Sequence, residues 1–182
     1  CCTACSKDEE SFKGKDADAS LSIAVKAVGS AVTKGFHPND ENELAGEAKV
    51  NNLSVLVFDE SGAQLIGYGW QATNSEGEAS ILNVPAMTMR AQIVIVSNTP
   101  ENSLAGVTSY SDFESKLAQL ADQSQSNLVM SSPVITTQAP LVKGDNYLGY
   151  ASMGSENING IAEPVEITRL AARLDLVNVK TD

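Results

Sequence analysis

Cysteine is absent from this chain after residue 5, and this absence limits what the cysteines at its start can do. Cys1, Cys2 and Cys5 lie too close together, and too near a free end, to cross-link a distant part of a core. A zinc site needs a fourth ligand, and the only histidine, His37, lies far along the chain. The sequence therefore predicts no metal site, and it assigns the cysteines to chemistry at the chain end itself.

Positive charge and long apolar runs are also scarce. The chain has 12 Lys and Arg against 23 Asp and Glu, which gives a net charge of −11. Binding to nucleic acid or to anionic lipid needs clustered Lys and Arg, so neither partner is expected. The longest apolar runs, such as Ile93–Val96, are far too short to span a bilayer. Any membrane attachment must therefore be covalent, and stable anchoring needs more than one acyl chain.

A recognisable catalytic set is missing as well. His37 stands next to Pro38 in a polar stretch, where it is typical of a surface residue rather than of a Ser-His-Asp or Cys-His arrangement. Asp59 and Glu60 are adjacent carboxylates, but the Ser-Gly pair that follows them is typical of a turn. The sequence therefore predicts neither an enzyme nor a cofactor.

The residues around Cys5 point to a lipid anchor. Thr3 and Ala4 place two small residues before Cys5, as a lipoprotein signal peptidase requires, and a polar, acidic run follows it. We interpret residues 1–19 as a lipoprotein N-terminus with a flexible tether. Cys1 is the alternative acceptor if the numbering starts at the mature end. A second alternative is that these cysteines are remnants of a signal peptide or of cloning.

Residues 20–182 are predicted to form a single β-domain that begins with a half-buried strand. Ser20–Val28 alternates, with Leu21, Ile23, Val25 and Ala27 on one face. Gly29–Lys49 is polar and is expected to be an exposed loop. Further strands are predicted at Leu53–Phe58, Gln64–Gln71, Glu78–Val84, Arg90–Val96, Leu128–Met130, Val134–Thr137 and Tyr147–Tyr150, with turns at Thr73–Gly77 and Lys143–Asn146.

Only one helix is expected. Ser111 and Glu114 have the spacing of a capping box, and apolar residues at helical intervals follow. The segment Pro164–Asp182 fits a helical and a strand pattern, and its flanking β-branched residues favour a strand. Many short strands and one short helix indicate an all-β fold, an antiparallel β-sandwich.

Several segments in this order resemble the N-terminal domain of fimbrillins, the pilus subunits of Bacteroidales. Asn146-Tyr-Leu-Gly-Tyr150 is similar to a strand of the family, and Pro164–Leu176 resembles the strand that closes its first domain. The strand ending at Asn98, the helix near Ser111 and the strand Asn127–Met130 fall in the expected order. The resemblance implies a transthyretin-like sandwich and a structural role in a fimbrium that supports adhesion.

The resemblance also implies how such a subunit assembles. Family members reach the outer membrane as lipoproteins, and a trypsin-like protease then cuts the loop after the first strand. The released strand leaves a groove, which a strand from the next subunit fills. In this chain, Leu21, Ile23, Val25 and Ala27 would form the removable strand, and Lys34-Gly35 is the best cleavage site. The best-known pattern has an arginine there, whereas this chain has none before Arg90.

Two alternatives remain at this stage. The first strand is either removed during assembly or kept as a permanent strand, as expected for an anchor subunit that keeps its lipid. The domain is either a polymerising subunit or a surface lipoprotein that binds glycan or a host ligand without polymerising. Tyr68 and Trp70 are the candidate platform for the second function, although a packing role suits them better. Family members carry the donor strand on a second sandwich domain, and Asp182 lies about where the first should close.

Overall fold

The computed structural model describes residues 17–28, 48–118 and 127–170. These residues form nine β-strands, one α-helix and two 3₁₀ helices. The strands are β1 (Ala19–Val28), β2 (Lys49–Asp59), β3 (Leu65–Glu76), β4 (Glu78–Ala86), β5 (Ala91–Ser97), β6 (Met130–Ser131), β7 (Ile135–Thr136), β8 (Gly144–Leu148) and β9 (Val165–Arg169). The helices are α1 (Tyr110–Leu117), η1 (Ala151–Glu156) and η2 (Ile158–Gly160). The prediction of a mostly β fold with one short α-helix is confirmed for this part of the chain.

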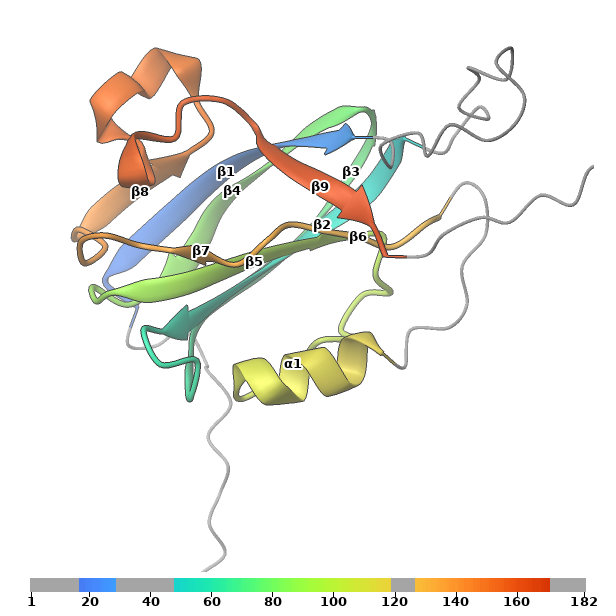
Figure 1. Cartoon of the computed structure of the whole chain (residues 1–182), viewed down its shortest axis with the longest axis horizontal. Helices are drawn as coiled ribbons and strands as arrows, with labels where there is room; N and C mark the ends of the chain where they lie inside the picture. Colours follow the sequence, from blue (N-terminus) through green and yellow to red (C-terminus); the bar gives the residue numbers. More distant parts are fainter. Residues whose placement is uncertain (1–16, 29–47, 119–126, 171–182) are drawn as a thin grey trace, which may run out of the picture.

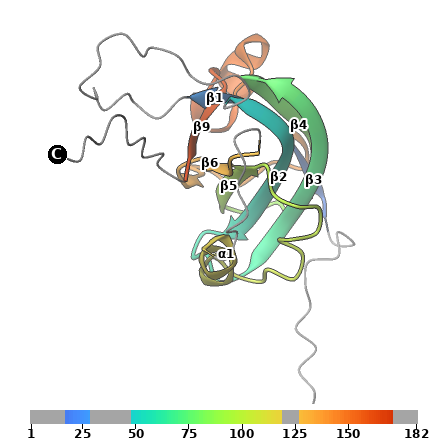
Figure 2. The same ribbon diagram turned by 90° about the vertical axis from the view of Figure 1, so that its right-hand side faces the viewer.

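The strands form a barrel-like sandwich. Hydrogen bonds connect them in the order β2-β3-β4-β1-β9-β6-β5-β7, β8 lies beside β1, and β2 also pairs with β5. That extra pairing joins the first strand of the order to the last but one, so the sheet curves around a common interior with α1 outside it (Figure 2). In Figure 1, β1 lies between β4 on one side and β8 and β9 on the other.

The prediction of a purely antiparallel sandwich is wrong at β1. This strand is antiparallel to β4, but it is parallel to both β8 and β9. Parallel neighbours need a long crossover between them, and most of the chain lies between β1 and β8. The alternation of apolar residues fixes which face of a strand is buried but not the direction of its neighbours, so the sequence did not reveal this pairing.

The core consists of two apolar clusters on opposite faces of β2 and β5. The interior cluster includes Leu21, Ile23, Val25, Val55, Ile81 and Ile93, all buried. The second cluster lies between the outer face of the sheet and α1, and includes Leu56, Phe58, Val94, Leu104 and Phe113. Because β2 and β5 are covered on both faces, their sequences are apolar on both faces, as predicted for the strand at Arg90–Val96.

The helix α1 begins two residues earlier than predicted. Its N-cap is Ser109, whose Oγ accepts a hydrogen bond from Asp112 N at 3.2 Å, so Ser111 lies inside the helix. Ser109 and Ser111 each precede an acidic residue by three positions, but only Glu114, after Ser111, is the residue type of a capping box. The fold selects the first, because Tyr110 N donates to Gly62 O at 2.9 Å and so ties the start of the helix to the β2–β3 turn.

Two predicted turns are also corrected. The turn at Thr73–Gly77 shrinks to Gly77, because β3 stays paired with β2 as far as Glu76. The predicted hairpin turn at Lys143–Asn146 is largely the beginning of β8, because Gly144 to Leu148 pair with β1 and not with β7. Strand pairing has overridden the local turn composition at both places, with the preceding strand β2 in the first case and with the distant strand β1 in the second.

Several predictions concern residues outside the described ranges. They are the three cysteines and most of the tether, the loop with Lys34, Gly35 and His37, and the end of the chain after Leu170. The predicted strand after Pro164 is confirmed as far as Arg169. None of the helices in the described part of the chain has the length and hydrophobicity needed to cross a bilayer.

Candidate functional site: the groove that holds strand β1

The apolar side chains of β1 point into the interior of the sandwich. Leu21, Ile23 and Val25 have no exposed surface, and Ala27 is partly buried against the same cluster. The alternating residues point outward, and Lys26 among them is exposed. The four residues predicted to form the removable strand are therefore brought together on one inward face, where they fill the groove between β4 and the pair β8 and β9.

The wall formed by β4 contains an irregularity opposite the middle of β1. Leu21 lies opposite Val84 and Ile23 opposite Ile81, so Ser22 alone faces both Leu82 and Asn83. Two residues against one is the definition of a β-bulge, and Asn83 has a φ of +56°, a left-handed conformation found in one class of bulge. A bulge fixes which residue of β1 lies at this point of the groove.

The opposite wall is built from two separate strands. Ala19 to Ile23 pair with β8, and Val25 to Val28 pair with β9, so the neighbour changes at Ala24. Gly149 lies at this change with a φ of +86°. A Cβ on Gly149 would lie 2.7 Å from the carbonyl oxygen of Ala24, closer than real Cβ contacts allow. The absence of a side chain at Gly149 therefore lets the backbone of β1 pass.

Both ends of β1 are tied to neighbouring turns. Before the strand, the Asp18 carboxylate accepts a hydrogen bond from Thr88 N at 2.8 Å, and Gly144 N donates to Asp18 O at 3.0 Å. Hydrogen bonds from the side chain and backbone of Thr88 hold the pKa of the Asp18 carboxyl below its ordinary value, although this group is exposed. At the other end, Ala27 N donates to Gly77 O at 2.6 Å.

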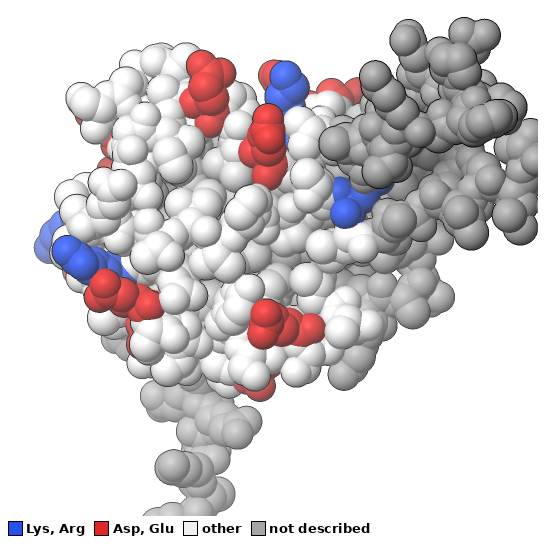
Figure 3. Space-filling view, in the orientation of Figure 1, with Lys and Arg blue, Asp and Glu red and all other residues white. Residues whose placement is uncertain are grey.

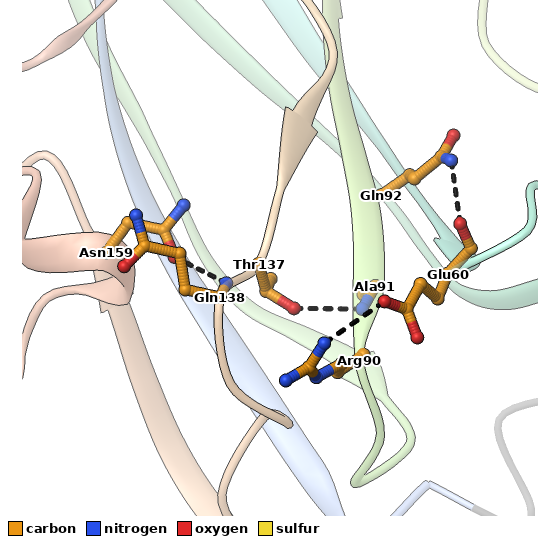
Figure 4. Close-up of polar contacts among 7 residues, drawn as sticks. All are labelled: Glu60, Arg90, Ala91, Gln92, Thr137, Gln138 and Asn159. Carbon is orange, nitrogen blue, oxygen red and sulfur yellow. Dashed lines mark hydrogen bonds and ion pairs between the residues drawn. The ribbon is translucent and has the colours of Figure 1, made fainter.

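The Asn159 side chain lies against the chain at the end of β7, where Figure 4 shows its hydrogen bond with Gln138. Asn159 Nδ2 donates to Thr136 O, and Gln138 N donates to Asn159 Oδ1, both at 2.8 Å, so one amide side chain imitates a neighbouring backbone. Nearby, Arg90 and Glu60 form an exposed ion pair at 3.2 Å, which contributes little to stability. Asn159 therefore occupies backbone groups at the edge of β7 that a further strand would need for pairing.

Comparison with known proteins identifies the family. Residues 19–169, from the first residue of β1 to the last of β9, match the family described as major fimbrial subunit protein (FimA). The chain belongs to the FimA fimbrial subunit family. Among its relatives is a candidate fimbrium tip subunit, Fim1C, of Parabacteroides distasonis, which is 48% identical over 99% of this chain and 48% of the relative.

Two further relatives support the FimA assignment. The major fimbrium subunit FimA type-2 of Porphyromonas gingivalis is 29% identical over 98% of this chain and 42% of the relative. A crystal structure of a candidate cell adhesion protein from Parabacteroides distasonis is 47% identical and superposes with a TM-score of 0.77, over 89% of this chain and 48% of that one. The chain thus spans about half the length of the relatives that it matches. Fim1C and FimA type-2 are named as fimbrial subunits, not as enzymes.

The structure also shows which features of this FimA-family groove the sequence failed to reveal. Gly149 belongs to the Asn-Tyr-Leu-Gly-Tyr segment that carried the resemblance, but its contact with Ala24 depends on a pairing that the alternation pattern does not show. The bulge at Asn83 has a weak signal in the sequence, because asparagine tolerates a positive φ. The predicted lipid acceptors and the predicted cleavage site lie outside the described residues.

The residues considered for sugar binding and for catalysis have structural roles in this fold. Tyr68 and Trp70 are half-buried on β3, and Tyr68 Oη and Trp70 Nε1 are both shielded from solvent. Burial accordingly raises the pKa of Tyr68. Asp59 is confirmed as a turn residue, since its Oδ1 accepts from Ala63 N at 2.8 Å. Polar atoms that are shielded from solvent suit packing better than a sugar-binding platform.

Proposed function

We propose that this chain is part of a fimbrial subunit that assembles on the cell surface by exchanging strand β1 for a strand of another subunit, and that the fimbrium supports adhesion. The observation that carries the proposal is the position of β1. It is paired along both edges, and its inward side chains from Ala19 to Val25 are buried. Yet the strand joins the rest of the described fold through residues 29–47 alone. A cut in this span would leave β1 held by non-covalent contacts only.

The groove is suited to accept a strand in place of β1. Without β1, backbone groups of β4, β8 and β9 would lose their partners, and the pockets of Leu21, Ile23 and Val25 would be exposed. An extended strand restores both kinds of contact by β-augmentation. Burying three large side chains contributes roughly 5–9 kcal/mol before the cost of ordering the strand. The donor would come from another fimbrial subunit.

The proposed cleavage site is the bond between Lys34 and Gly35, and the proposed enzyme is a trypsin-like protease that accepts lysine. Limited trypsin digestion should therefore give an early cut after Lys34, identified by mass spectrometry, and Lys34→Gln should delay it. The cut protein should then release its N-terminal fragment and bind a synthetic peptide with the sequence Ala19–Val28. Fluorescence anisotropy of the labelled peptide measures this binding.

The uncut protein serves as the control, because its groove stays filled and it should bind no peptide. A cut protein that simply unfolds and is not rescued by the peptide would show that β1 is a permanent strand. In that case the anchor-type alternative, in which the strand and the lipid are kept, would replace the exchange.

We also propose that Cys5 carries the lipid that holds the precursor at the outer membrane. The support is the sequence around it, with Thr3 and Ala4 before and an acidic run after. Metabolic labelling with an alkyne fatty acid should modify the full-length precursor, and Cys5→Ser should abolish the labelling whereas Cys1→Ser should not. Loss of labelling in Cys1→Ser alone would move the acceptor to Cys1.

A further inference from the structure

The outward face of β1 carries one charged side chain, and its neighbours on both sides are acidic. Lys26 is the only charged residue of β1 and is exposed. Its partner on β4 is Glu78 and its partner on β9 is Glu166. Both glutamates are exposed as well. Laterally paired residues of neighbouring strands point to the same face, so Lys26 occupies the position between two glutamates on the surface of the sheet. Its ammonium group forms no ion pair within 4 Å with either glutamate while β1 is in place.

The other outward positions of β1 differ from this one. Ser20 lies opposite Pro85 and Asp145, and its Oγ donates to Asp145 Oδ1 at 2.7 Å. Ala24 lies opposite Ser80, at the point where the wall changes from β8 to β9. Position 26 is therefore the one outward position of β1 with an acidic residue on each side. On the face shown in Figure 3, charged side chains are scattered and do not gather into a patch.

We propose that the groove selects its donor strand by a cation: the strand that replaces β1 carries a lysine or arginine at the position of Lys26, seated between Glu78 and Glu166. The inference rests on the proposed strand exchange and names the chemistry of its partner. Opposite charges placed laterally in a sheet stabilise the pairing, and a carboxylate at this position would face two like charges.

The shape of the groove makes this cation a marker of register and direction. The inward positions are filled by a small residue at each end, Ala19 and Ala27, and by larger residues between them. A slip of two residues keeps the inward face inward, but it forces a large side chain into an alanine position and moves the cation away from Glu78 and Glu166. We therefore expect donor strands to run in the direction of β1, parallel to β8 and β9, and to bind in one register.

The test uses the protein after cleavage at Lys34 and three labelled peptides. The first has the sequence Ala19–Val28, the second carries Lys26→Glu, and the third exchanges the residues at 24 and 26 (Ala24→Lys with Lys26→Ala). The third peptide has the same composition and net charge as the first, so a difference between the two does not come from total charge. At low salt, we expect the dissociation constant to be about fivefold larger for the third peptide than for the first, and about tenfold larger for the second.

The same differences should shrink in 1 M salt, where charges are screened over about 3 Å. They should also shrink in protein carrying Glu78→Gln and Glu166→Gln, which leave β1 itself unchanged. Equal binding of all three peptides would overturn the cation rule while leaving strand exchange intact. Failure of every peptide to bind the cut protein would overturn strand exchange, and the cation rule with it.

Discussion

Replacing Ile23 with alanine is expected to lower the free energy of unfolding of the intact chain by about 2–5 kcal/mol. Ile23 has no exposed surface and lies at the centre of β1, opposite Ile81 on β4 and Leu148 on β8. The smaller side chain loses its burial and leaves a cavity between two walls that pair with the same strand. Urea denaturation followed by circular dichroism measures the change, provided that both proteins unfold in a single transition.

The matched control for Ile23→Ala is Ser22→Ala. Ser22 is adjacent on the same strand but is directed outward and partly exposed. Its Oγ accepts only a long hydrogen bond, 3.4 Å from Asn83 N, so the substitution should lower stability by no more than about 1 kcal/mol. Similar losses in both variants would contradict the view that β1 is integral to the core. Cleaved protein with Ile23→Ala should also release its N-terminal fragment faster, since release of β1 breaks the contacts that the substitution weakens.

Replacing Gly149 with alanine is expected to cost about 2–5 kcal/mol, from left-handed backbone strain together with a steric clash. The new Cβ would lie 2.7 Å from Ala24 O, 3.1 Å from Pro164 Cα and 3.2 Å from Glu163 O. All three are backbone atoms, so the wall of the groove must move to make room. Urea denaturation measures the loss, and the cut protein should bind the Ala19–Val28 peptide more weakly.

Gly144→Ala separates the two contributions to that loss. Gly144 has a φ of +88°, close to the +86° of Gly149, but a Cβ there would have nothing within 4 Å. Gly144→Ala should therefore show the backbone strain alone, about 1–2 kcal/mol. A Gly149→Ala variant no less stable than Gly144→Ala would mean that β1 does not pass as close to Gly149 as the structure indicates.

The inward face of β1 was predictable from the sequence, because alternation of Leu21, Ile23 and Val25 with polar or small residues directly reports burial of one face. The strand at Arg90–Val96 was predictable for a similar reason, since both faces of β5 are covered. These predictions depend only on how apolar residues are spaced along a short segment, and that spacing can be read from the segment itself.

The partners of β1 were not predictable in the same way. Nothing in Ser20–Val28 specifies that its neighbours on one side run parallel or that β8 gives way to β9 at Ala24. The choice of Ser109 over Ser111 as helix cap also depends on a distant contact, the bond from Tyr110 N to Gly62 O. The residues of β1 therefore predicted a half-buried strand, and the family resemblance marked it as the candidate site, whereas the strands on either side of it had to be seen in the structure.

The parallel pairing of β1 has a consequence for the order of folding. Ser20 and Asp145, joined by a hydrogen bond, are 125 residues apart in the chain. During synthesis from the N-terminus, β1 meets β4 early, but it has no second neighbour until β8 and β9 have been made. Contacts of such long range form late in folding. We therefore expect the loss caused by Ile23→Ala to appear mainly in the unfolding rate, in the unfolding arm of a chevron plot. In this order of folding, most of the groove forms in each molecule before β1 of the same molecule occupies it.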